Sequence, residues 1–335
     1  MRTPEYLSPT SFSLFYKDIT EFYLKYLADN RPPRFPQTEP MSVGSSFDAH
    51  VKSYLYDKLF GSKDPKFDLT TLFEAQVEEQ NRDFALEAGR VCFDAYKEHG
   101  ALADIMLELE QADTDPKFEF KVEGHVAHGD EVDGLAFYGY PDVFFHTKSG
   151  SAVIFDWKVN GFCSKGNVSP KKGYIMLRGP MDMRGVHCPH KDAQMMVVNG
   201  LTINIGHHME QIDESWANQE TIYAWILGEE VGAEFVVGID QLAIGPNPDF
   251  KDHSTPPAIR IARHRCTVSK EHQFELFKKA AWVWKIIKSG WIFRDMTEDE
   301  SRLRQSMLDQ HHLAYEGEGQ NEEWFRNSTR QHKNF

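Results

Sequence analysis

The chain has 335 residues, with 51 acidic and 37 basic side chains and a formal net charge of −14. This length can bury a substantial core, whereas four scattered cysteines give no disulfide framework and fit a reducing compartment. No apolar stretch reaches the roughly eighteen residues of a membrane span and no basic, apolar leader opens the sequence, so we expect a cytoplasmic protein without a membrane partner.

Two helices separated by a proline-rich connection are predicted near the N-terminus. Residues 7–27 place Ser and Thr cap candidates before an amphipathic aromatic pattern, and residues 43–60 form a second helical pattern. In the second helix Asp48 shares a face with apolar residues, and a carboxylate there suits a hard cation. His50 is the alternative ligand, and a solvated helix surface is the alternative for both residues.

A helical region and a strand are predicted next. Residues 70–100 and 101–111 have amphipathic helical patterns, and residues 118–122 read as a short strand. Glu119 and Glu123 at this strand are further candidate metal ligands.

Two aromatic and apolar runs joined by a turn predict a pair of strands at 134–145 and 152–158. Side chains alternate along a strand, so Asp156 and Lys158 project to one face. If the partner strand brings Asp142 opposite, two carboxylates converge beside one lysine. Such a cluster is costly unless a divalent cation neutralises it, and oxygen ligands favour Mg²⁺ or Mn²⁺. A surface turn with a solvated salt bridge is the alternative.

Residues 161–190 lack clear periodicity and are basic, which is typical of a long functional loop near a site. A second basic run covers residues 256–294. Basic patches attract phosphate backbone even on an acidic protein, although solvated faces are the alternative. The candidate nucleic-acid contacts in the loop are Lys165, Lys171, Lys172 and Arg178.

Histidines and a cysteine in the same loop raise a different hypothesis. His187, Cys188 and His190, followed by residues 207–208 (His-His), offer zinc ligands, but their spacing matches no standard finger. Exposed or hydrogen-bonded histidines are the alternative.

The C-terminal half predicts a helix over 211–228, a strand over 233–244 and a basic amphipathic helix over 267–287. In the first helix Gln219 and Tyr223 lie four residues apart and share one surface patch. Side chains that only satisfy core hydrogen bonds are the alternative.

Residues 141–142 (Pro-Asp) and 156–158 (Asp-Trp-Lys) resemble the motif of the PD-(D/E)XK nuclease superfamily. Residues 219–223 resemble the Q-x-x-x-Y motif of its RecB-like branch, which includes the RecB and AddAB nuclease domains and CRISPR-associated exonucleases. The resemblance spans residues 7–244 in ordered pieces. It implies an α/β fold with a restriction-endonuclease-like core, in which a mixed central β-sheet is flanked by helices.

The resemblance also implies roles for individual residues. The catalytic residues are Asp142, Asp156 and Lys158. The metal ligands are Asp142, Asp156 and the Trp157 carbonyl. As a further ligand we favour Asp48, for its charge and its helical phase rather than from the resemblance. Gln219 helps to hold the nucleic acid or the site, and Tyr223 contacts the nucleic-acid strand.

Two features depart from the RecB-like pattern. The family often has a histidine four residues after a glycine, but here Asp48 stands four residues after Gly44, and His50 is two residues late. The third metal ligand therefore stays open between Asp48 and His50. The cysteines (Cys92, Cys163, Cys188 and Cys266) are too dispersed for the iron–sulfur cluster of many relatives.

We therefore expect a Mg²⁺- or Mn²⁺-dependent DNase that leaves 5′-phosphate products, acting as an exonuclease on DNA ends in recombination, repair or replication. An endonuclease of the same fold and a non-catalytic nucleic-acid-binding module are the alternatives. One nuclease domain is expected over residues 1–315, with an N-terminal helical region (1–112) and a catalytic core (113–295). A polar tail (316–335) follows it. The expected partner is double- or single-stranded DNA, in a bacterium or for a virus in a bacterial host; a homo-oligomer or a recombination partner protein stays open.

Overall fold

The computed structural model describes residues 2–29, 31, 34–61, 63–129, 131–161, 186–187, 194–198, 201–245, 249–251 and 257–290, together with residues 299, 302 and 306. The helices are α1 (Pro9–Lys17), α2 (Ile19–Phe22), the π-helical segment η1 (Tyr23–Leu27), α3 (Glu39–Phe60), the 3-10 turns η2 (Pro65–Phe67) and η3 (Glu79–Asn81), α4 (Leu69–Gln76), α5 (Arg82–Glu98), α6 (Ala101–Glu110), α7 (Met209–Ile212), α8 (Glu214–Ile226) and α9 (Lys270–Ser289). The strands are β1 (Lys117–Phe118), β2 (Val122–His128), β3 (Glu131–Gly139), β4 (Val143–His146), β5 (Ala152–Gly161), β6 (Val186–His187), β7 (Gln194–Val198), β8 (Leu201–Ile205), β9 (Val236–Ile244) and β10 (Ile259–Thr267).

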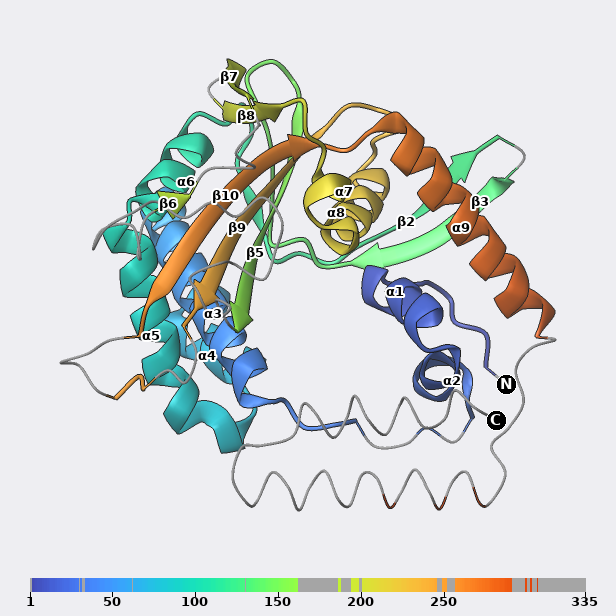
Figure 1. Cartoon of the computed structure of the whole chain (residues 1–335), viewed down its shortest axis with the longest axis horizontal. Coiled ribbons are helices and arrows are strands. Elements are labelled where there is room, and N and C mark those ends of the chain that lie inside the picture. Colours follow the sequence, from blue (N-terminus) through green and yellow to red (C-terminus); the bar gives the residue numbers. More distant parts are fainter. Residues whose placement is uncertain are drawn as a thin grey trace.

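A mixed sheet forms the centre of the described chain, in the strand order β1-β4-β5-β9-β10-β6 (Figure 1). β4 is antiparallel to β1 and β5, and β9 is antiparallel to β10, whereas β5 runs parallel to β9. Parallel neighbours need a crossover connection, and the chain between β5 and β9 includes α7 and α8. Every residue of β9 is buried, as expected for a central strand covered on both faces. The predicted α/β class, with a mixed central sheet flanked by helices, is confirmed.

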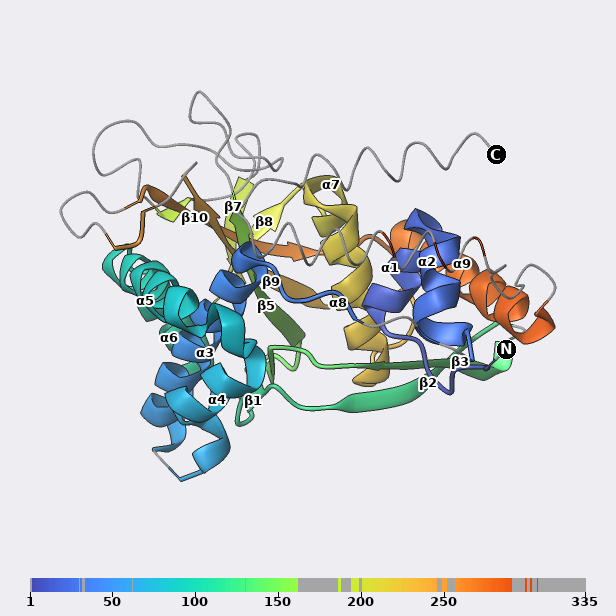
Figure 2. The same ribbon diagram turned by 90° about the horizontal axis from the view of Figure 1, so that it is seen from below.

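Helices cover both faces of this sheet. α3, α4, α5 and α6 lie on one face, and α7 and α8 lie on the other (Figure 1, Figure 2). Phe155 and Trp157 of β5 belong to the hydrophobic cluster of α3, α5 and α6, whereas Ile154 belongs to the cluster of α8. This period of two turns Asp156 and Lys158 toward α8, opposite to Trp157, as the sequence predicts.

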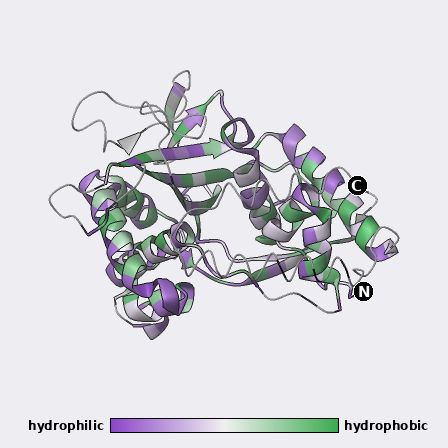
Figure 3. Cartoon of the chain, turned by 60° about the horizontal axis from the view of Figure 1, so that its bottom comes forward, coloured by the Kyte–Doolittle hydropathy of each residue, from purple (hydrophilic) through white to green (hydrophobic). Residues whose placement is uncertain are grey.

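A third hydrophobic cluster lies beyond α8. It joins α1, α2, η1, the β2–β3 hairpin and α9, and α8 contributes Ile222 and Trp225 to it (Figure 1). The helical region predicted over residues 1–112 thus supplies two clusters, with α1 and α2 here and α3 to α6 against the sheet. The helices alternate between hydrophobic and hydrophilic residues, as expected for elements with one buried face (Figure 3). The predicted tail 316–335 lies outside the described residues.

Four predicted elements are wrong in their continuity. The N-terminal helix expected within residues 7–27 is interrupted at Asp18, whose side chain caps α2. The strand expected at 134–145 is split into β3 and β4, because Pro141 lacks the N–H that a ladder needs. The helix expected at 70–100 is split into α4 and α5, since the backbone N–H groups of Gln37 and Glu78 donate to each other's side chains and fix an extended connection. The helix expected at 211–228 restarts at Asp213, whose carboxylate caps α8.

Across the described ranges, every helix is too short or too polar to cross a bilayer.

Candidate metal centre

Asp142 lies in the loop just before β4, beside β5. Its backbone oxygen accepts the Glu119 N–H at 3.1 Å, and its Oδ2 accepts the Trp157 N–H at 3.1 Å. The β4–β5 ladder ends at Val143 opposite Phe155. Beyond this point the Asp142 side chain, rather than a strand backbone, accepts the N–H of Trp157 on β5. The N–H and C=O of a strand residue face the same neighbour, so the Trp157 carbonyl faces this edge too. The predicted ligands Asp142 and Trp157 are therefore brought together.

The carboxylates of Asp48 and Glu119 converge with that of Asp142 on the side that faces α3. One oxygen from each of Asp48, Glu119 and Asp142 lies within 4.8 Å of the other two. The Lys52 side chain is 1% exposed, and its Nζ lies 2.7 Å from Asp48 Oδ2 and 2.8 Å from Asp142 Oδ1 and pairs with Glu119. Gln76 Nε2 donates to Asp48 Oδ2 at 2.9 Å and to Glu119 Oε2 at 3.3 Å. A cavity of about 270 Å³ is lined by these five residues.

The alternative ligand His50 points away from this trio. Its Nδ1 lies 2.8 Å from the Ser46 carbonyl oxygen, and its ring packs 5.9 Å from the Phe93 ring of α5. Of the two candidate ligands, Asp48 is therefore the one that reaches the site.

Glu119 is held in a backbone conformation that L-residues rarely adopt. Its φ is +42°, the only positive φ of a non-glycine residue in the described ranges. The Lys66 ammonium donates to the Glu119 carbonyl at 3.0 Å, and the Glu119 N–H donates to the Asp142 carbonyl. Strain of this kind persists only where the surroundings fix it, and it accumulates at functional sites. Here it aims the Glu119 carboxylate at Lys52.

A second polar group lies on the α8 side of Asp142. Lys158 pairs with Asp156 and donates to Gln219 Oε1 at 3.1 Å. Glu220 is fully buried, and neither of its carboxylate oxygens has a hydrogen-bond partner among the described residues. Asp156 and Glu220 therefore share the single ammonium of Lys158. Around Lys52, the three carboxylates of Asp48, Glu119 and Asp142 likewise share one ammonium.

Burial and neighbouring charge set the protonation of the α3 side. Burial raises the pKa of Asp48 to about 7 although Lys52 acts in the opposite direction. Burial also acts to raise the pKa of Asp142, but the charge and hydrogen bond of Lys52 outweigh it and hold this pKa below its usual value. For Lys52, the carboxylates outweigh burial and raise the pKa well above the usual range. Asp142 and Lys52 are thus charged at neutral pH.

On the α8 side, the negative charge exceeds what Lys158 neutralises. Burial, with Asp142 nearby, raises the pKa of Asp156 well above its usual value. Burial raises the pKa of Glu220 to about 8 against the effect of Lys158. The Lys158 pKa is raised because Asp156 and Glu220 outweigh the effect of burial. Without a further cation, this half of the site retains protons near neutral pH.

Glu220→Gln is expected to flatten the pH dependence of stability in the metal-free protein. The folded pKa of Glu220 is about 8 and lies above the unfolded value, so wild-type stability falls as pH rises from the unfolded pKa toward 8. One such group contributes a slope of up to about 1.4 kcal/mol per pH unit, and glutamine removes it. Urea unfolding between pH 5 and 8 in a chelator measures the difference. Glu230→Gln, an exposed residue after α8, is the control; parallel curves for wild type and Glu220→Gln would contradict the prediction.

Tyr223 supports the loop that carries Asp142. The side chain is 7% exposed, and burial together with Glu220 raises its pKa while the Tyr140 backbone donates a hydrogen bond to it. A Cβ at Gly139 would lie 2.1 Å from Tyr223 Cε1, so only glycine lets the strand pass the ring this closely. Residues 139–142 are thereby positioned by α8.

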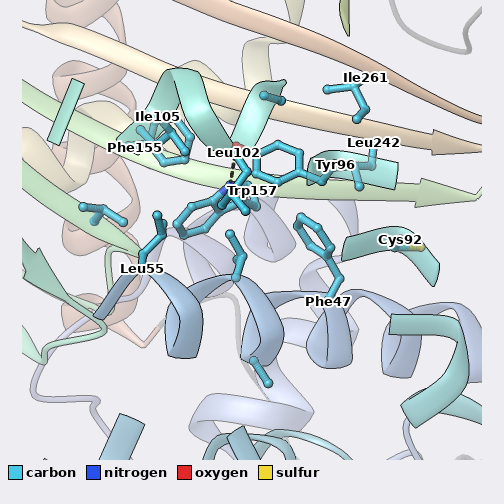
Figure 4. Close-up of a cluster of buried hydrophobic side chains, with 14 of the residues drawn as sticks. Phe47, Leu55, Cys92, Tyr96, Leu102, Ile105, Phe155, Trp157, Leu242 and Ile261 are labelled. Carbon is cyan, nitrogen blue, oxygen red and sulfur yellow. Dashed lines mark hydrogen bonds between the residues drawn. The ribbon is translucent and has the colours of Figure 1, made fainter. Parts of the chain in front are cut away.

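A buried network anchors Trp157 from the other face. The indole Nε1 donates to the Tyr96 hydroxyl at 3.2 Å (Figure 4). This hydroxyl donates to Asp240. Arg265 Nη1 lies 2.9 Å from Asp240 Oδ1, and its Nε lies 3.0 Å from Glu108 Oε2. The network links β5, α5, β9, β10 and α6 behind the site. The sequence does not predict it, because its members are far apart in the chain.

The predicted basic run 256–294 does not form one solvated face. Arg260 and Arg265 of β10 are buried, and Arg263 pairs with Asp104. Exposed lysines of this run, such as Lys278, belong to α9. The buried arginines of β10 cannot meet a phosphate backbone, and a phosphate-binding role for α9 stays a prediction.

Several predicted contacts lie outside the described residues. They are Lys165, Lys171, Lys172, Arg178, Cys188 and His190, together with the side chain of His187. His208 Nδ1 lies 3.0 Å from Thr267 Oγ1, and the metal-competent cluster found among the described residues contains no histidine.

No protein-family model matches the chain, and a search of curated proteins returns no match. A solved structure titled "Crystal structure of SSO0001" is similar over 82% of this chain and 86% of its own, at 11% identity and a TM-score of 0.24. A similarity this low carries no argument about fold or activity.

Proposed function

We propose that this protein is a Mg²⁺- or Mn²⁺-dependent deoxyribonuclease with a restriction-endonuclease-like core, of the RecB-like type. One observation carries the proposal. The Asp142 carboxylate joins those of Asp48 and Glu119 around Lys52, and on its other side it lies beside the Asp156–Lys158 pair of β5. Lys158 in turn is bonded to Gln219 of the Q-x-x-x-Y segment. Motif residues that are distant in sequence thus meet at one place.

The donor set fits a hard divalent cation. Asp48, Glu119 and Asp142 offer only carboxylate oxygens, and the Trp157 carbonyl is a further oxygen at the same edge, the ligand type that Mg²⁺ and Mn²⁺ prefer. Asp156 lies on the other side of Asp142 and is a further candidate ligand. When bound, the cation would polarise a phosphodiester and lower the pKa of a water molecule.

The protein side chains have separable roles in such a reaction. Lys158, fixed by Asp156 and Gln219, orients the attacking water or stabilises the negative charge that develops on the phosphate. Tyr223 keeps residues 139–142 in place, which is a positioning role. Its contact with nucleic acid, implied by the resemblance, stays a prediction. By resemblance, the products carry a 5′-phosphate and a 3′-hydroxyl, and the DNase is an exonuclease of recombination, repair or replication.

Lys158→Ala is expected to lower the cleavage rate by about 100- to 1,000-fold, as for removal of one charge-stabilising donor. The assay compares linear and circular, single- and double-stranded DNA with Mg²⁺ or Mn²⁺. Lys148→Ala, an exposed lysine in the turn before β5, is the control and should cleave at the wild-type rate. An equal loss in both variants, or none in Lys158→Ala, would contradict the role of Lys158.

The substrate set separates the modes of action. Degradation of linear substrates alone supports an exonuclease, whereas cutting of circles indicates an endonuclease. DNA binding without cleavage of any substrate would favour a binding module.

A further inference from the structure

Lys52 places a cation inside the candidate metal centre. Its ammonium touches an oxygen of Asp48, of Glu119 and of Asp142, the same three residues whose oxygens converge for metal binding. The distances of 2.7 and 2.8 Å to Asp48 and Asp142 are about 0.6–0.8 Å longer than the Mg²⁺–oxygen bonds of about 2.0–2.1 Å, the difference between an ammonium contact and a metal ligand at one position. The ammonium therefore stands where a shared metal ion of these carboxylates would lie.

A divalent cation and this ammonium cannot share the position. Two positive charges at contact distance repel strongly in a buried site, and each oxygen that binds the metal gives up its contact with Lys52. Lys52 is 1% exposed and comes from the middle of α3, so its ammonium leaves the trio only by moving along the cavity that it lines.

The surroundings indicate that one ammonium is an incomplete substitute for the metal. Glu220 is fully buried without a hydrogen-bond partner for either oxygen among the described residues, and the charge of Asp142 acts on it. Two ammonium groups, those of Lys52 and Lys158, face five carboxyl groups here, and not all of these can be ionised together. An exchange of one positive charge for two would reduce this deficit.

We propose that Lys52 is a built-in counter-ion that the divalent cation displaces. In the metal-free protein the ammonium holds Asp48, Glu119 and Asp142 together; on metal binding it moves into the cavity, where an approaching phosphate meets it. The inference rests on the metal centre of the proposed nuclease. It predicts that the native lysine stabilises the metal-free fold and weakens metal binding.

Lys52→Met tests the exchange by calorimetric titration with Mn²⁺ in the absence of DNA. The variant is expected to bind Mn²⁺ at least about 10-fold more tightly than wild type, because the competing state is removed. Its metal-free melting temperature is expected to fall, and Mn²⁺ should raise it by more than in wild type. Lys58→Met, an exposed lysine of the same helix, should match wild type in both measurements. Equal or weaker Mn²⁺ binding by Lys52→Met would overturn the exchange.

A measurement on the wild-type chain covers the case in which Lys52→Met does not fold. Reductive methylation followed by peptide mass spectrometry reports how accessible each lysine is. Lys52 should be protected in chelator and become several-fold more reactive with saturating Mn²⁺, while Lys58 stays unchanged. Unchanged Lys52 reactivity with Mn²⁺ bound would overturn the exchange and leave the nuclease proposal standing. If wild type binds no Mn²⁺, the metal centre and the exchange both fail.

Discussion

Asp142→Asn is expected to weaken Mn²⁺ binding by at least about 100-fold and to lower DNA cleavage by at least about 1,000-fold. Asp142 is the residue that both halves of the site share: Oδ1 contacts Lys52 and Oδ2 accepts the Trp157 N–H. Asparagine keeps the size and one oxygen but loses the charge, and its NH₂ group has to face either a donor N–H or an ammonium. Calorimetric titration with Mn²⁺ and a cleavage assay on the same preparation measure both effects.

The exposed carboxylate of Asp94 on α5 gives a control for this variant. Asp94→Asn removes one charge without touching the site and should retain binding and cleavage. Circular dichroism should show folded protein for both variants. Wild-type Mn²⁺ affinity in folded Asp142→Asn would contradict the ligand role of Asp142.

Arg265→Met is expected to destabilise the fold by about 3–5 kcal/mol, the usual cost of removing one partner from a buried ion pair. Arg265 is 4% exposed and lies between Asp240, which is fully buried, and Glu108. Burial acts to lower its pKa, but Glu108 and Asp240 outweigh it and raise the pKa further. Methionine fills a similar volume and leaves two buried carboxylates without their cation. Urea unfolding at neutral pH measures the loss.

Arg263→Met is the matched control, because it lies two residues away on β10 and pairs with the more exposed Asp104. Its expected cost is below about 1 kcal/mol, as for most solvent-accessible pairs. Equal losses for the two variants would show that the buried network does not support the sheet.

The half of the site that follows strand periodicity was predictable from the sequence. Asp156 and Lys158 are two residues apart on one strand, so their shared face follows from the pleat alone. The Pro-Asp pair also marks where a strand ladder is interrupted, although we expected a continuous strand there. Asp48 was correctly placed on the inward face of its helix.

The residues that the sequence did not reveal depend on tertiary contacts. Lys52 is four residues after Asp48, a spacing that usually indicates an exposed ion pair on a helix, and here both residues face inward. Glu220 follows Gln219 and lies between Trp216 and Tyr223 in helical phase, which in retrospect indicates an inward carboxylate. Arg265 and Glu108 are separated by 157 positions, so no local pattern predicts their pairing.

Cleavage of end-labelled linear DNA by the wild-type chain in Mg²⁺ or Mn²⁺ tests the proposed nuclease most directly. We expect 5′-phosphate products that disappear on chelation, return when the metal is restored, and are absent with Asp142→Asn. Wild-type protein that binds Mn²⁺ but leaves every DNA substrate intact, or cleavage that continues in Asp142→Asn, would contradict the proposal.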